Sequence, residues 1–110
     1  MTPDQINAKC AEVMGLYPTP EGYWTTNPAR RISIEYKWFK ELPNFTGSHD
    51  AAMQFVEHLK ESGIRITMTN YTTSEWLVTA HPSGMWKEGP NLPALICEVG
   101  LRALGVWSTE

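Results

Sequence analysis

Long apolar stretches are missing from this sequence. No run of apolar residues approaches the roughly 20 that a transmembrane helix needs, so we expect no membrane-spanning segment. The first ten residues, MTPDQINAKC, lack the apolar centre of a secretory signal peptide. We therefore expect a cytoplasmic protein.

The motifs of nucleotide cofactors and thiolate zinc sites are also absent. The sequence has no GxGxxG or P-loop pattern and no CxxC pair. Its two cysteines, Cys10 and Cys97, lie on the apolar faces of predicted helices, which favours buried free thiols over the alternative of a disulfide. Because these motifs are absent, we expect no cofactor. Nine basic residues against twelve acidic ones give a net charge of −3, so we expect no general nucleic-acid binding.

No arrangement of side chains predicts a catalytic or metal site. Ser48, His49 and Asp50 stand in a row, but neighbours at a helix start do not converge as a nucleophile, base and orienter must. A helix cap at Ser48 is the better interpretation. His49 and His58 are nine residues apart, which places them on opposite sides of a helix, and His81 lies on a predicted strand. We expect no catalytic residue and no metal ligand.

What the sequence does contain fits a single domain over residues 1–110, with 42% hydrophobic and 19% charged residues. Three segments carry helical signals. The first covers residues 3–14. The second begins near Ser48 and is closed by Gly63, and the third follows Asn91 and ends at Gly105. Apolar residues cover most of the third helix, so we expect it to be the most buried.

Five segments carry strand signals, at residues 22–25, 32–39, 64–69, 75–81 and 85–88. In the second, Ile32, Ile34, Tyr36 and Trp38 alternate with polar residues, which is typical of a half-buried strand. A polar turn is predicted at 70–74 and a short tail at 106–110. The order of elements predicts an α+β fold. We expect a mostly antiparallel sheet of about four or five strands, with the three helices layered on both faces as an α/β/α sandwich.

Two blocks resemble a known group of proteins. Residues 42–53, Leu-Pro-Asn-Phe-Thr-Gly-Ser-His-Asp-Ala-Ala-Met, resemble a motif of small phage and prophage proteins, in which Leu-Pro and a Tyr or Phe precede Thr-x-Ser-x-Asp-Ala-Ala and an aliphatic helix. Residues 92–105 resemble their closing helix, commonly Pro-Ala-x-Ala-x-Cys followed by Ala-Leu-Lys-Ala. The chain is in this respect similar to the phage ABA-sandwich group, whose name states the layering expected above.

The resemblance implies an origin in a phage or prophage and gives no catalytic residues to carry over, because the group has no assigned function. Phage proteins of this size often serve in counter-defence or as accessory proteins. Within the first block, Phe45 stands where the group often has Tyr. We interpret Phe45, Ser48 and Asp50 as structural: an anchor for the turn, a helix cap and an acid in the first helical turn.

The aromatic residues are the most informative feature for function. Tyr23 and Trp24 lie in a Pro- and Gly-rich segment shortly before Arg30 and Arg31, and Tyr36 follows. Aromatic side chains beside arginines suit a protein interface. They also suit stacking on a base with contacts to phosphate, and a third interpretation is that Tyr23 and Trp24 merely cover an end of the sheet.

We therefore expect a non-enzymatic phage-type accessory protein, in the cytoplasm of a host cell, that acts by binding. Its partner would be a host protein that it blocks, held by residues 16–40. The alternative is a sponge for a small nucleotide-type signal, and a hydrolase is the least favoured. A homodimer is a further expectation, because an open strand edge and an aromatic loop favour pairing.

Overall fold

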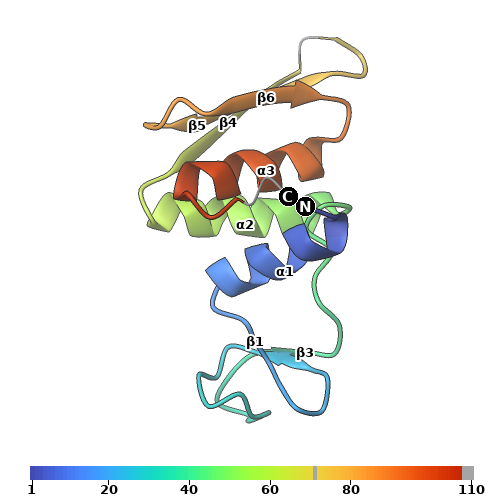
Figure 1. Ribbon diagram of the computed structural model, residues 1–110, viewed down its shortest axis with the longest axis vertical. Coiled ribbons are helices and arrows are strands. Elements are labelled where there is room, and N and C mark those ends of the chain that lie inside the picture. The colour runs from blue at the N-terminus through green and yellow to red at the C-terminus, as the bar shows by residue number, and fades with distance from the viewer. Residues whose placement is uncertain (71, 108–110) are drawn as a thin grey trace.

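Three helices and two three-stranded antiparallel sheets make up the computed structural model, which describes residues 1–70 and 72–107 (Figure 1). The predicted turn at 70–74 and tail at 106–110 therefore fall partly outside the described residues. The elements follow in the order α1 (Pro3–Val13), β1 (Tyr17–Pro18), β2 (Trp24–Thr25), β3 (Trp38–Phe39), α2 (His49–Glu61), β4 (Arg65–Asn70), β5 (Trp76–His81), β6 (Trp86–Gly89) and α3 (Leu92–Leu104).

The helices begin where side chains satisfy the first free backbone N–H groups. Ser48 Oγ accepts a hydrogen bond from the N–H of Ala51 at 3.3 Å, and Asn91 Oδ1 accepts one from the N–H of Ala94 at 3.3 Å. The three predicted helices are confirmed within one or two residues. Eight of the 13 residues of α3 are buried, against five of 13 in α2 and four of 11 in α1, so α3 is the most buried helix, as predicted.

The larger sheet has the strand order β4-β5-β6 and follows the predicted alternation. Ile66 lies opposite Ala80, and Met68 opposite Val78, so that their side chains share the face turned toward the helices. Ile66, Val78 and Ala80 are buried. The predicted strands at 64–69, 75–81 and 85–88 are confirmed, each within a residue or so of the observed ends.

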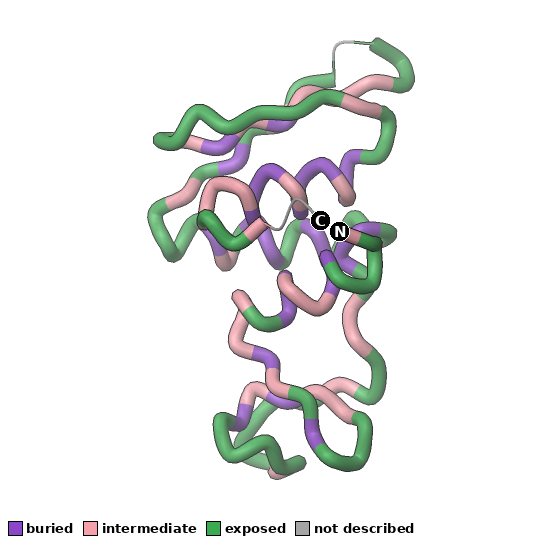
Figure 2. Tube along the Cα trace, viewed as in Figure 1, coloured by how far each residue is buried: buried purple, intermediate pink, exposed green. Residues whose placement is uncertain are grey.

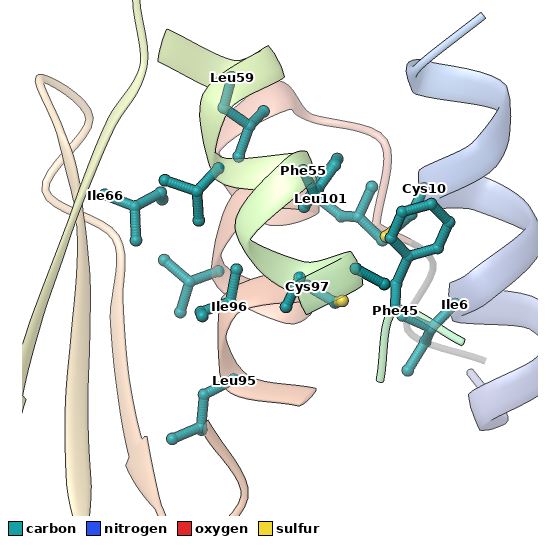
Figure 3. Close-up of a cluster of buried hydrophobic side chains, with 14 of the residues drawn as sticks. Ile6, Cys10, Phe45, Phe55, Leu59, Ile66, Leu95, Ile96, Cys97 and Leu101 are labelled. Atoms are coloured by element: carbon teal, nitrogen blue, oxygen red, sulfur yellow. The ribbon is translucent and has the colours of Figure 1, made fainter. Parts of the chain in front are cut away.

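The core lies between this sheet and the helices. α2 and α3 pack on the inner face of the sheet, and α1 packs against α3 from the opposite side (Figure 1). Figure 3 shows side chains of all three helices meeting there, with Phe45 reaching in from the loop before α2. The Phe45 ring lies 6.3 Å from that of Phe55, edge to face. Cys10 and Cys97 are buried and free in this core.

The layering differs from the predicted α/β/α sandwich, which is not confirmed. No helix in residues 1–70 or 72–107 covers the outer face of the larger sheet, where β4 presents the polar residues Arg65, Thr67 and Thr69. The surplus helix is accommodated by stacking α1 beneath α2 and α3. The single sheet of four or five strands is likewise replaced by two sheets of three.

The predicted strand at 32–39 is wrong over most of its length, since only Trp38–Phe39 forms β3. β2 is also short and ends at Thr25. Pro28, which has no N–H to donate to a neighbouring strand, lies in the turn that follows. Residues 31–37 therefore have no partner strand, and their apolar side chains face solvent instead of the core.

Candidate functional site

Residues 17–43, here called the lobe, form one end of a molecule that measures 44 × 27 × 25 Å. Figure 1 shows the lobe below α1, at the end opposite the larger sheet. In the lobe, β1 pairs with β2 and β2 with β3, with Trp24 opposite both Pro18 and Phe39. Trp24 and Phe39 are partly buried against the main core and so connect the lobe to it. The lobe is a small module whose own sheet has two residues per strand.

A network of hydrogen bonds around Asn27 shapes the loop that leaves β2. Its N–H donates to Thr25 Oγ1 at 3.1 Å, and its Nδ2 donates to the carbonyl oxygen of Arg31 at 3.1 Å. Asn27 Oδ1 accepts from the N–H of Ala29 at 3.0 Å, while its carbonyl oxygen accepts from the N–H of Arg30 at 2.9 Å. The side chain and backbone of one buried residue thus fix the backbone of residues 29–31, which carries both arginines.

Arg30 has a backbone conformation that side chains rarely adopt. Its φ is +58°. No other non-glycine residue in the described part of the chain has a positive φ. A non-glycine residue in this region costs of the order of 1–3 kcal/mol, which the surrounding hydrogen bonds offset. The conformation brings the guanidinium to 5.9 Å from the centre of the Tyr17 ring, within cation–π range.

Two pockets meet at Arg30. The first has a volume of ≈ 510 Å³ and is lined by Arg30 and Arg31 together with Thr19 and Glu21. The second, of ≈ 430 Å³, is lined by Tyr17, Trp24 and Arg30, with Glu12 of α1 on its wall. Pro18 and Arg30 belong to both. One pocket is therefore rich in cations and the adjoining one in aromatic rings.

The far end of the lobe carries exposed apolar side chains. Ile34 is 104% exposed, Trp38 49%, and Ile32 and Tyr36 40% each; these four residues are called the apolar tip below. The N–H of Tyr36 donates to the carbonyl oxygen of Ser33 at 3.2 Å, which closes a turn with Ile34 inside it. In Figure 2 the lower end of the molecule is coloured mostly as exposed, with short buried and intermediate stretches between.

Charge is distributed unevenly between the lobe and the rest of the chain. Four basic and three acidic residues give the lobe a net charge of +1, so with −3 overall the remaining residues carry −4. The lobe residues concerned are Arg30, Arg31, Lys37 and Lys40 against Glu21, Glu35 and Glu41. The apolar tip therefore lies on the more basic part of an acidic protein.

The structure separates the predicted binding residues into two groups. Trp24 and Arg30 line one pocket, and Arg31 lines the next. Tyr36 belongs to the apolar tip, and the Tyr23 ring lies 5.6 Å from that of Trp38. The sequence predicted that the isoleucines and Trp38 of the apolar tip lie on a half-buried strand. Their alternation does not show whether a partner strand is available, so the sequence held no clear signal that they face solvent.

The Ser48-His49-Asp50 run contains no converging side chains. Ser48 is engaged as the cap of α2, while His49 and Asp50 are exposed in its first turn. Among the residues that the structure describes, no three His, Cys, Asp or Glu side chains gather to hold a metal ion. In the same part of the chain, no helix has both the length and the apolar character needed to cross a bilayer.

One solved structure shares this architecture over nearly the whole chain. It is a phage protein from Bacillus cereus, with a TM-score of 0.66 and 19% sequence identity, and the match covers 99% of this chain and 93% of the other. At this level of identity the likeness shows the fold alone. No family model matches the chain, and no curated protein does so.

Proposed function

We propose that this protein is a phage- or prophage-type accessory protein that binds a host protein and blocks it, without catalysing a reaction. The apolar tip is the observation that carries the proposal: Ile34 is fully exposed, Ile32 and Tyr36 lie on the same loop, and Trp38 follows as the first residue of β3. The likeness in fold to a phage protein and the resemblance of residues 42–53 both support the phage setting.

Water is an unfavourable environment for such a loop. Turn positions usually carry Gly, Pro, Asn, Asp or Ser, whereas here the turn that starts at Ser33 continues with Ile34. Burying one isoleucine side chain stabilises a complex by about 1.5–3 kcal/mol. Tyr, Trp and Arg are the residues over-represented in binding hot spots, and the lobe brings all three together. A protein with an apolar pocket and an acidic rim is the partner that these side chains fit.

Counter-defence in the host cytoplasm is the role we assign to this binding. A blocking protein requires a surface and no reactive centre, and Ser48, the residue closest to a nucleophile by sequence pattern, is engaged as a cap. The basic character of the lobe would speed association with an acidic target and make it sensitive to salt.

Capture from a bacterial lysate tests the proposal when matched variants are used. Ile34→Glu places a charge in the apolar tip, and Met53→Glu places one on an exposed apolar residue of α2, which is 40% exposed and lies outside the lobe. We expect the wild-type protein and Met53→Glu to capture the same discrete host protein, and Ile34→Glu to lose it. Equal capture by all three proteins would contradict the role of the tip.

A further inference from the structure

We propose that the lobe also binds a small molecule that combines a planar ring with a phosphodiester, a ligand of the cyclic-nucleotide class, in the two pockets that meet at Arg30. This site lies at Tyr17, Trp24, Arg30 and Arg31 and shares no residue with the apolar tip. The test of ligand binding at this site is therefore independent of the test for a host partner.

Arg30 lies where the two pockets meet. The residue belongs to both pockets, and it adopts a strained backbone conformation that the Asn27 hydrogen bonds maintain. Strain of this kind clusters at functional sites, where surrounding structure holds a side chain in place for a ligand. The residue whose backbone is fixed in this way carries a guanidinium, a group that recognises phosphate oxygens through two parallel hydrogen bonds.

The ≈ 510 Å³ pocket is lined by groups that can bind a phosphodiester. Arg31 adds a second guanidinium, and Thr19, which is only 7% exposed, adds a hydroxyl. Thr19 Oγ1 accepts a hydrogen bond from the N–H of Tyr23 at 3.0 Å, and a hydroxyl that accepts one bond still has a hydrogen to donate. Glu21 on the same wall lowers the charge of the pocket to +1. A phosphodiester, with a single negative charge, matches that value better than a terminal phosphate.

The adjoining pocket of ≈ 430 Å³ is lined by aromatic rings. Trp24 offers a ring on which a planar base can stack, and the Arg30 guanidinium lies over the Tyr17 ring beside it. Glu12 can accept hydrogen bonds from the N–H groups of a base. Each pocket falls within the roughly 300–1,000 Å³ range of ligand sites, and their shared wall places ring and phosphate in adjacent compartments.

Calorimetric titration with cyclic AMP, cyclic GMP and cyclic di-AMP tests the site, with adenosine, AMP and inorganic phosphate as the comparison ligands. We expect at least one cyclic nucleotide to bind more tightly than adenosine or phosphate, and to raise the melting temperature as a ligand of the folded state must. Absence of both heat and thermal shift for all six compounds at millimolar concentration overturns the proposal. Equal affinity for inorganic phosphate and the cyclic nucleotides overturns it too, because the aromatic pocket would then play no part.

Two variants and a control locate the binding. Arg30→Gly removes the guanidinium and suits the positive φ, so the folded protein should be no less stable. We expect it to weaken binding by about 10- to 100-fold, the loss of a charge-assisted hydrogen bond, and Arg31→Gln to weaken it as well. Arg65→Gln, on the exposed face of β4, should bind as the wild type does. Unchanged affinity in Arg30→Gly would overturn the assignment.

Discussion

At Gly100, α3 packs closely against α2. A Cβ atom there would come within 2.7 Å of Leu59 Cδ1 and 2.8 Å of Phe55 Cε2, both in the core. We predict that Gly100→Ala lowers the free energy of unfolding by up to about 2 kcal/mol, because overpacking costs about 1–3 kcal/mol and the higher helix propensity of Ala offsets about 1 kcal/mol of it. Gly89→Ala is the control, since its nearest neighbour, Leu95 Cδ2, is at 3.5 Å. Urea denaturation compares the two, and an equal cost would mean that α3 does not pack so closely.

Cys10 links stability to pH. A hydrogen bond with the Cys97 thiol, together with burial, raises the pKa of the Cys10 thiol well above its ordinary value of 9.0. The unfolded chain therefore loses this proton first as the pH rises. The stabilisation is complete below about pH 9 and declines above it, by up to about 1.4 kcal/mol per pH unit.

The matched variant for this effect is Cys10→Ala, which has no thiol to titrate at that position. We predict that its free energy of unfolding falls less steeply between about pH 9 and about pH 10.5 than that of the wild type. Urea denaturation at several pH values measures both slopes. Parallel slopes would show that the Cys10 thiol titrates alike in the folded and unfolded chains.

Single residues were predictable from sequence where the physics is local. The caps at Ser48 and Asn91 depend on a hydrogen bond three residues along the chain, so the residue type was sufficient. The role of Asn27 was not predictable, because its value lies in four hydrogen bonds whose geometry exists only after the loop has formed.

Among the elements, the lobe is the least supported. Its strands have two residues each, and it is tied to the main core by a few partly buried side chains such as Trp24 and Phe39. Short strands and few buried contacts give low local opening free energies. We predict that backbone amides of residues 17–43 exchange with deuterium at least about tenfold faster than those of α2 and α3. Mass spectrometry of peptic peptides measures this, and uniform protection would contradict it.

Two segments with alternating apolar residues were both predicted as strands, and only one of them forms a strand along its length. Residues 64–69 have a partner, since β4 pairs with β5 over six residues, and their apolar face is buried. Residues 32–38 have the same period of two, but within this segment only Trp38, which belongs to β3, is paired with another strand. Alternation thus marks an apolar face in both cases, and only the tertiary structure decides whether the core or a partner covers it.

For the whole molecule, the order of elements predicted the α+β class but not the layers. Three apolar helices suggested cover on both faces of one sheet, whereas the Arg and Thr residues of β4 leave one face open, and α1 joins the helical layer instead. The sequence did not predict that the lobe forms a separate end of the molecule. Its shape depends on the hydrogen bonds of Asn27, which exist only in the folded loop.

The apolar tip could also contact a second copy of the chain, as in the predicted homodimer. If the partner of the apolar tip is a second copy of the chain, Ile34→Glu will convert a dimer to a monomer in sedimentation or light scattering, while Met53→Glu will not. A wild-type protein that is monomeric at all accessible concentrations would leave a different protein as the occupant of the tip.

The apolar tip, and not the helices or the outer face of the larger sheet, is the surface that we propose contacts the partner. Photo-crosslinking in host cells tests it directly, with p-benzoylphenylalanine placed at Ile34 or Trp38 in the tip, and at Met53 or Trp86, which are 40% and 64% exposed elsewhere. We predict one discrete crosslinked protein from both tip positions and none from the other two. Crosslinks from position 53 or 86, with none from position 34 or 38, would contradict it.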